Sequence, residues 1–143
     1  MSNRLLTLGV LLVAVLVGGT IIVPVHAKIL STSIYYPKSV KRGEYFTVTV
    51  QIVQDDKVGT GGISGSLYLE VKGYSKFFYL TGPTKVKFTF FKNAQGLYVG
   101  SASLSFGTRT DKGTGTGSIT FQLSACFIVC IKGNVHGVNV QVK

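Results

Sequence analysis

YFTVTVQI, residues 45–52, carries the alternation that decides the fold class of this chain. Its even-numbered positions are apolar, and its odd-numbered positions are tyrosine, threonine or glutamine. Successive side chains of a β-strand point to opposite faces of a sheet, so this pattern predicts a strand with one face on a core. No window of about 11 to 18 residues beyond Ala27 shows the helical period of apolar residues.

The same alternation recurs along the chain and predicts an all-β domain. We expect about eight strands, near residues 28–36, 45–53, 63–72, 77–81, 84–92, 97–106, 118–128 and 135–142. Residues with turn chemistry separate them, at Gly43, Gly73, Gly82-Pro83, 93–96 and Gly133-Asn134. The sequence therefore predicts a two-sheet antiparallel, immunoglobulin-like β-sandwich of about seven to eight strands over residues 28–143.

The first 27 residues predict export from the cytosol. Arg4 precedes an uncharged run over residues 5–23, and Val25-His26-Ala27 has the small-x-small pattern of a signal-peptidase site. The run exceeds the usual signal core of about 7 to 15 residues and approaches the roughly 20 that span a bilayer. A cleaved signal peptide and a retained membrane anchor over residues 1–27 both stay open. In either case we expect the domain to be secreted or held at the cell surface.

Composition and charge narrow the classes of partner. The chain has 143 residues, of which 45% are hydrophobic and 14% are charged, so it has the composition of a folded domain. Its formal net charge is +10. Such an excess favours anionic partners, such as acidic polysaccharide or lipid head groups. The export signal argues against nucleic acid as the main partner.

The chain offers few groups for catalysis. Beyond the leader its one histidine is His136, and its carboxylates are Glu44, Asp55, Asp56, Glu70 and Asp111. Asp55 and Asp56 are adjacent and point opposite ways in an extended chain, so they cannot form a glycosidase-like pair. Residues 59–65 and 107–118 are rich in glycine but lack the frame of a phosphate-binding loop, and we expect hairpin loops there. We therefore expect neither enzymatic activity nor a cofactor.

The two cysteines, Cys126 and Cys130, lie inside an apolar run. Outside the cytosol two cysteines should pair. In a straight strand their Cα atoms would stand about 13 Å apart, which is beyond the reach of a disulfide. We therefore expect a bulge, a turn or one helical turn between them. A structural disulfide closing so short a loop would contribute about 1 to 2 kcal/mol, and an exchange-active pair, a metal site and free thiols stay open as alternatives.

A C-x3-C motif followed by a histidine is similar to the dinuclear copper loop of cytochrome oxidase second subunits. That family continues with a histidine four residues after the second cysteine and then a methionine. Here His136 lies six residues after Cys130, and no methionine follows Met1. Cys126, Cys130 and His136 supply three ligands, whereas a structural zinc site needs four. The number of ligands makes a degenerate copper-loop subunit the weakest alternative.

GTGTGSITFQLSACFIVCIKGNVHGVNVQV, residues 113–142, resembles the exported N-terminal domain of the transmembrane thiol:disulfide interchange reductases. The likeness is carried by Phe121, Gln122, Ala125, Cys126, Cys130 and the alternating Val138, Val140 and Val142. It implies that the two cysteines exchange with a thioredoxin-like partner. Such exchange needs an accessible sulfur and a lowered thiol pKa, whereas the apolar residues 127–129 predict burial.

SVKRGEYFTVTVQI, residues 39–52, looks like the opening of secreted immunoglobulin-like surface modules. Such modules serve adhesion, scaffolding or filament assembly, and some complete a neighbour's sandwich with an N-terminal strand. KILSTSIYY, residues 28–36, is placed either to do that or to pair within its own sandwich. Crowded aromatics near residues 74–79 also favour self-association. We therefore expect a structural or interaction module of the cell surface, with copies of itself or other surface proteins as partners.

Overall fold

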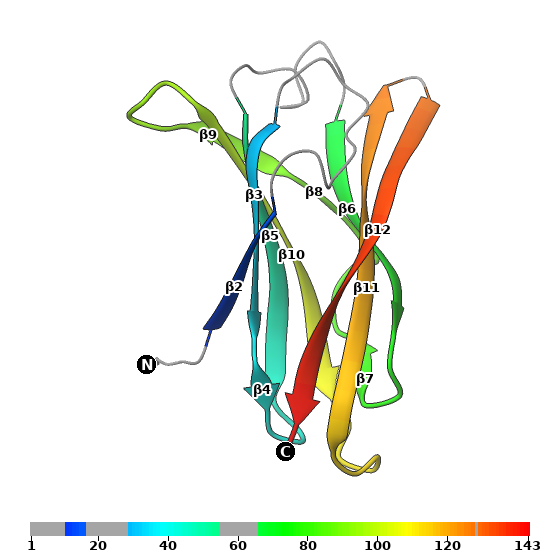
Figure 1. Ribbon diagram of the computed structural model, residues 1–143. Coiled ribbons are helices and arrows are strands. Elements are labelled where there is room, and N and C mark those ends of the chain that lie inside the picture. Colours follow the sequence, from blue (N-terminus) through cyan, green and yellow to red (C-terminus); the bar gives the residue numbers. More distant parts are fainter. Residues whose placement is uncertain (1–10, 17–28, 55–65, 128) are drawn as a thin grey trace.

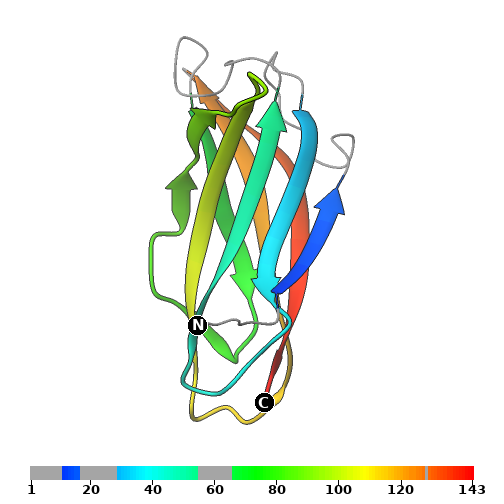
Figure 2. The same cartoon turned by 90° about the vertical axis from the view of Figure 1, so that its left-hand side faces the viewer.

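The computed structural model describes residues 11–16, 29–54, 66–127 and 129–143, and these residues form two β-sheets and no helix (Figure 1). One sheet has six strands, β2 (Leu11–Leu16), β3 (Ile29–Pro37), β5 (Tyr45–Gln54), β7 (Phe78–Leu80), β9 (Thr89–Lys92) and β10 (Tyr98–Thr108). The other has five, β4 (Ser39–Val40), β6 (Ser66–Tyr74), β8 (Lys85–Lys87), β11 (Gly115–Phe127) and β12 (Val129–Val142). The predicted all-β sandwich is confirmed, and Figure 2 shows its elongated form from the side.

Strand order follows from the pairing. The first sheet runs β2-β3-β5-β10-β7, with β9 also on β10, and the second runs β4-β12-β11-β6-β8. Neighbours are antiparallel except β12 and β4, which are parallel. The immunoglobulin-like topology stays a prediction, because short strands such as β4 and β7 occupy the outer positions of the two sheets.

The apolar positions of the alternating pattern fill the space between the sheets. On β5, Phe46, Val48, Val50 and Ile52 are all buried, as the sequence predicts. Each large apolar side chain taken out of water in this way stabilises the fold by about 1.5–3 kcal/mol. The opposing sheet contributes Leu67, Leu69, Ile119, Phe121, Leu123, Ala125, Val138, Val140 and Val142.

The predicted strand over residues 84–92 is wrong, because the chain crosses from one sheet to the other inside it. β8 pairs with β6 in the second sheet, and β9 pairs with β10 in the first. Phe88, between the two, is 2% exposed and anchors the crossing in the core. Alternation alone cannot show such a crossing, because the period of two is the same on either side of it.

Two of the predicted turns are also wrong, because Gly73 and Gly133-Asn134 lie inside strands. The register of β11 on β6 passes from Thr120↔Gly73 to Phe121↔Val71 and so skips one residue of β6. On the other side it passes from Gln122↔Val135 to Ser124↔Lys132, leaving Gly133 and Asn134 opposite a single residue. Both are β-bulges, a role that glycine serves inside strands.

The remaining loop predictions have mixed outcomes. The loop expected over residues 107–118 is shorter, since β10 extends through Thr108 and β11 begins at Gly115. The loop expected at 59–65 lies outside the described residues. The segment at 28–36 corresponds to β3, which pairs with β5 of its own chain, and that was one of its two expected roles.

The six residues of β2 lie within the predicted leader and pair antiparallel with β3, from Leu11↔Pro37 to Leu16↔Thr32. The described residues contain no helix that is long and apolar enough to cross a bilayer.

Close packing across β11 gives a test of the core. A Cβ at Gly117 would overlap the ring of Phe78, which is 1% exposed. We expect Gly117→Ala to lower the free energy of unfolding by about 1–3 kcal/mol, because the ring must leave its place in the core. Denaturant unfolding followed by circular dichroism measures this.

Gly137→Ala on the neighbouring strand is the matched control, because its Cβ would meet Thr120 at an ordinary 3.4 Å. We expect a change within about 0.5 kcal/mol. Equal effects of the two substitutions would contradict the packing of Phe78 against Gly117.

Candidate functional site

Cys126 and Cys130 form a disulfide at the tip of the β11–β12 hairpin. The two residues are cross-strand partners, with their Cα atoms 4.0 Å apart. The chain reverses between them, so the expected turned segment and the expected pairing are both confirmed. The described part of the chain therefore contains no free cysteine.

The disulfide lies on the outer face of the second sheet. Leu123 and Ala125 of β11 point into the core, so the alternation places Ser124 and Cys126 on the opposite face. Cys126 is half-buried and Cys130 is exposed. The predicted burial of the apolar residues 127–129 is wrong at Val129, which is 64% exposed. At the hairpin tip β12 pairs with β11, and no other described strand covers its free edge.

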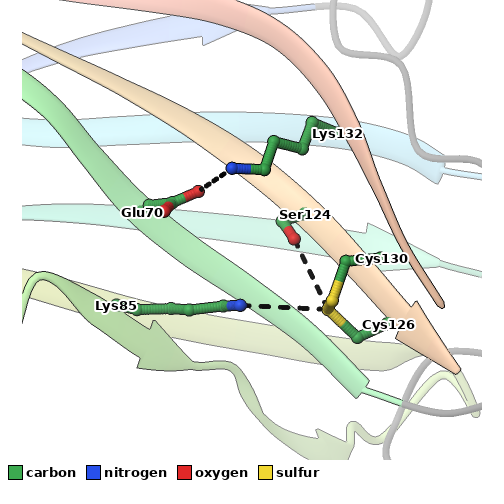
Figure 3. The surroundings of a disulfide bond; sticks show 6 residues. All are labelled: Glu70, Lys85, Ser124, Cys126, Cys130 and Lys132. Carbon is green, nitrogen blue, oxygen red and sulfur yellow. Dashed lines mark hydrogen bonds and ion pairs between the residues drawn. A yellow bond between two sulfur atoms is a disulfide. The ribbon is translucent and has the colours of Figure 1, made fainter. Parts of the chain in front are cut away.

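Polar groups approach only one of the two sulfurs (Figure 3). Lys85 Nζ lies 4.0 Å from the Sγ of Cys126, and the Oγ of Ser124 lies 3.6 Å from the same atom. A cation and a hydroxyl donor beside a thiolate favour its charged form. If the disulfide opened, both groups would face the charge on the sulfur of Cys126.

The Lys85 ammonium also contacts an aromatic ring on this outer face. Its Nζ lies 4.7 Å from the ring centroid of Tyr68, so the ammonium stands between an aromatic face and a sulfur. Tyr68 is the register partner of Ser124, and Ser124 is the partner of Lys132. The Nζ of Lys132 in turn pairs with Glu70 Oε1 at 3.1 Å, linking β12 to β6 across β11.

The third candidate ligand, His136, does not join the two cysteines. It is the register partner of Phe121, and the two rings lie 6.3 Å apart on the core side of the sheet, opposite the disulfide. In this oxidised state the sulfurs of Cys126 and Cys130 are bonded to each other and offer no thiolate. The described residues contain no group of three or more histidine, cysteine or acidic side chains that could hold a metal.

Two of the carboxylates have structural partners. Glu44 Oε1 accepts a hydrogen bond of 2.7 Å from the backbone N–H of Lys41, and Glu70 pairs with Lys132. Asp111 is exposed. Glu44 therefore closes its own turn and Glu70 cross-links two strands, while Asp55 and Asp56 lie outside the described residues.

Sequence reasoning missed a second feature, the outer edge of β12. Within the described residues, β4 pairs with this edge at Gln141 and Val142, and no described strand pairs with it over residues 129–133 and 137–140. Asn134 and His136, between those ranges, each have a partner of their own. The exposed apolar side chains of the edge are Val129, Ile131 and Val135, of which Val135 is 54% exposed. The turn expected at Gly133-Asn134 hid this feature, because it divided one long strand in two.

The aromatic side chains near residues 74–79, whose crowding favours self-association, and their neighbours divide between core and surface. Phe78 and Tyr36 are core residues, whereas Phe91 and Tyr74 are exposed. The most exposed aromatic is Tyr45, at 72%.

No protein family model matches this chain, and no curated protein matches its sequence. The geometry of its surfaces is therefore the basis for a proposed function.

The disulfide gives a stability prediction. We expect the Cys126→Ser, Cys130→Ser double variant to lose about 1–2 kcal/mol of unfolding free energy, because a loop this short removes little entropy from the unfolded chain. Denaturant titration of wild type and variant measures the difference. A reducing agent should bring the wild type to the same midpoint and leave the variant unchanged, and an effect of the reductant on the variant would contradict this assignment.

Proposed function

We propose that the protein is an exported β-sandwich module of the cell surface that associates with copies of itself or with other surface proteins by strand addition. The open edge of β12 carries the proposal. An edge strand presents unpaired backbone N–H and C=O groups, and an added strand satisfies them. Val129, Ile131 and Val135 would be taken out of water at the same time.

The length of the edge suits a short added strand. The bulge at Gly133-Asn134 divides it into residues 129–132 and 135–140. At the corresponding edge of the other sheet, six residues of β2 pair with β3. A strand of similar length could therefore occupy residues 135–140.

The leader suggests how two copies would join. Cleavage after Ala27 would remove β2 and open the outer edge of β3 as well. Pairing of β3 in one copy with β12 in the next is a heterologous contact, which extends into a filament, whereas β12 with β12 closes a dimer. The proposal covers both arrangements, and the mass of the assembly distinguishes them.

A charge at the edge tests strand addition. We expect the wild type to form dimers or longer assemblies at micromolar concentration, and the Ile131→Lys, Val135→Lys variant to be a monomer, because lysine on an edge opposes pairing. Size-exclusion chromatography with light scattering measures the mass.

Tyr45→Lys is the control, since it adds one lysine at an exposed aromatic position of the first sheet, away from the edge of β12. It should assemble as the wild type does. A wild type that stays monomeric, or a control that dissociates equally, would rule out this use of the β12 edge.

A second candidate function, thiol:disulfide interchange, is favoured by the asymmetric surroundings of the disulfide. An incoming thiolate would attack the exposed Cys130 Sγ, forming a mixed disulfide while the S–S bond breaks and Cys126 leaves as a thiolate. Lys85 and Ser124 stand where that charge appears. The partner's second thiolate then attacks the partner's first sulfur, which is bonded to Cys130 in the mixed disulfide. The partner is thereby oxidised to a disulfide, and Cys130 leaves as a thiolate that takes up a proton.

Removing the cation tests interchange. We expect Lys85→Met to slow reduction by a dithiol such as thioredoxin by about three- to tenfold, because a leaving thiol with a higher pKa departs more slowly. Lys87→Met, two residues along the same short strand, should leave the rate unchanged. Stopped-flow assay of thiol release measures both, and identical rates for the two variants would exclude a role for Lys85.

A further inference from the structure

The end of the sandwich opposite the disulfide holds an open cavity of about 550 Å³. It is lined by Lys41, Arg42, Thr110 and Lys143. These residues come from the turn before β5, the β10–β11 loop and the residue after β12. Three chain segments that are distant in the sequence thus present three cationic side chains to one space.

Backbone hydrogen bonds hold the lining in place. Arg42 N–H donates to the carbonyl of Lys143 at 3.3 Å, and Gly43 N–H donates to that of Thr108 at 3.0 Å. Thr108 in turn donates hydrogen bonds from both its backbone N–H and its hydroxyl to the carbonyl of Glu44. Gly43 has a φ of 86°, a left-handed conformation that favours glycine, so the turn depends on it. The cations therefore project from a fixed frame.

The charge at this end is poorly compensated. Of the residues that the structure describes, only Lys132 and Glu70 form an ion pair, and they lie on a different part of the sandwich. The carboxylate side chains at this end of the sandwich are Glu44, which accepts a hydrogen bond from backbone, and Asp111. The exposed cations in the turns and strand ends of the same end are Lys38, Lys41, Arg42, Lys76, Arg109, Lys112 and Lys143. Concentrated positive potential of this kind attracts polyanions.

Aromatic rings lie beside the cations. Tyr45 directly follows the Lys41–Glu44 turn and is 72% exposed. Its hydroxyl interacts with that of Tyr79, and this hydrogen bond raises the pKa of Tyr79. The ring of Tyr79 lies over Gly107, whose missing side chain makes room for it, and the guanidinium carbon of Arg109 lies 5.6 Å from the ring centroid. Tyr45, Tyr79 and Arg109 thus form one cluster, which follows directly in the chain on the turn that carries Lys41 and Arg42.

We infer that this basic end binds an acidic polysaccharide. Lys41, Arg42 and Lys143 contact its carboxylate or sulfate groups, and Tyr45 stacks on a sugar ring. An exposed amphipathic ring suits a ligand with both apolar and polar faces. The large exposed aliphatic side chains of the described residues, Val129, Ile131 and Val135, are all on β12 rather than here, which favours a sugar chain over a lipid surface as the ligand of this end. The inference rests on the proposed location outside the cell.

The test uses the purified protein on immobilised polygalacturonate at about 0.1 M salt, where charges within roughly 10 Å still interact. We expect Lys41→Gln, Arg42→Gln, Lys143→Gln to raise Kd at least about tenfold, since each of the three exposed charge contacts accounts for a factor of up to about five. Lys72→Gln, Lys87→Gln, Lys92→Gln removes the same charge from exposed positions elsewhere. This control should change Kd by less than about twofold. Equal weakening by both triple variants would mean non-specific attraction and overturn the site.

Tyr45→Ala separates a sugar ligand from an anionic surface. We expect it to weaken binding to polygalacturonate about three- to tenfold, as the loss of one stacked ring does elsewhere. Its effect on binding to phosphatidylglycerol vesicles should be less than about twofold. Tight binding to vesicles with none to polygalacturonate would overturn the inference in favour of lipid. Unchanged circular dichroism and thermal midpoints show that the variants are folded.

Failure of this inference and failure of strand addition are distinguishable. The Ile131→Lys, Val135→Lys variant leaves the basic end intact and should bind polygalacturonate as the wild type does. Loss of binding in that variant would overturn the site. A wild type that stays monomeric yet binds through Lys41, Arg42 and Lys143 would overturn strand addition alone.

Discussion

The burial of one face of each central strand is the constraint on which the rest of this structure depends. Phe46, Val48, Val50 and Ile52 meet the inward side chains of β11 across the core. Because the period of a strand is two, a slip of one residue would turn all of them to solvent, so the register is strongly determined. The same register decides which residues reach the surface, and Cys126 faces outward because Ala125 faces inward.

Bulges and glycines change which residues can reach the core and where aromatic rings can pack. The bulge at Gly133-Asn134 changes the side of β12 on which alternate residues lie, so Val138 and Val140 reach the core. Gly107 and Gly117 leave room for the rings of Tyr79 and Phe78. The sandwich therefore carries two distinct surfaces on one core: the edge of β12, whose tip holds the disulfide, and the basic end.

Much of the fold was predictable because it depends on local alternation. Seven of the expected strands have a counterpart close to their predicted ranges, and the pairing of Cys126 with Cys130 was one of the alternatives that the sequence left open. The split at Phe88 and the bulges at Gly73 and Gly133 were not predictable in the same way. Each depends on which strand lies alongside, and glycine has the same sequence signal in a turn as in a bulge.

The sequence by itself determined the all-β class, the inward residues of the long strands and the need for a turn between the cysteines, because each follows from the geometry of a short stretch of chain. Only the tertiary structure decided which groups meet. Lys85 reaches Cys126 because β8 pairs with β6 and β6 with β11, and Lys41 lies near Lys143 because β4 pairs with the end of β12. Contacts between residues so far apart in the chain depend on strand order, which no local pattern encodes.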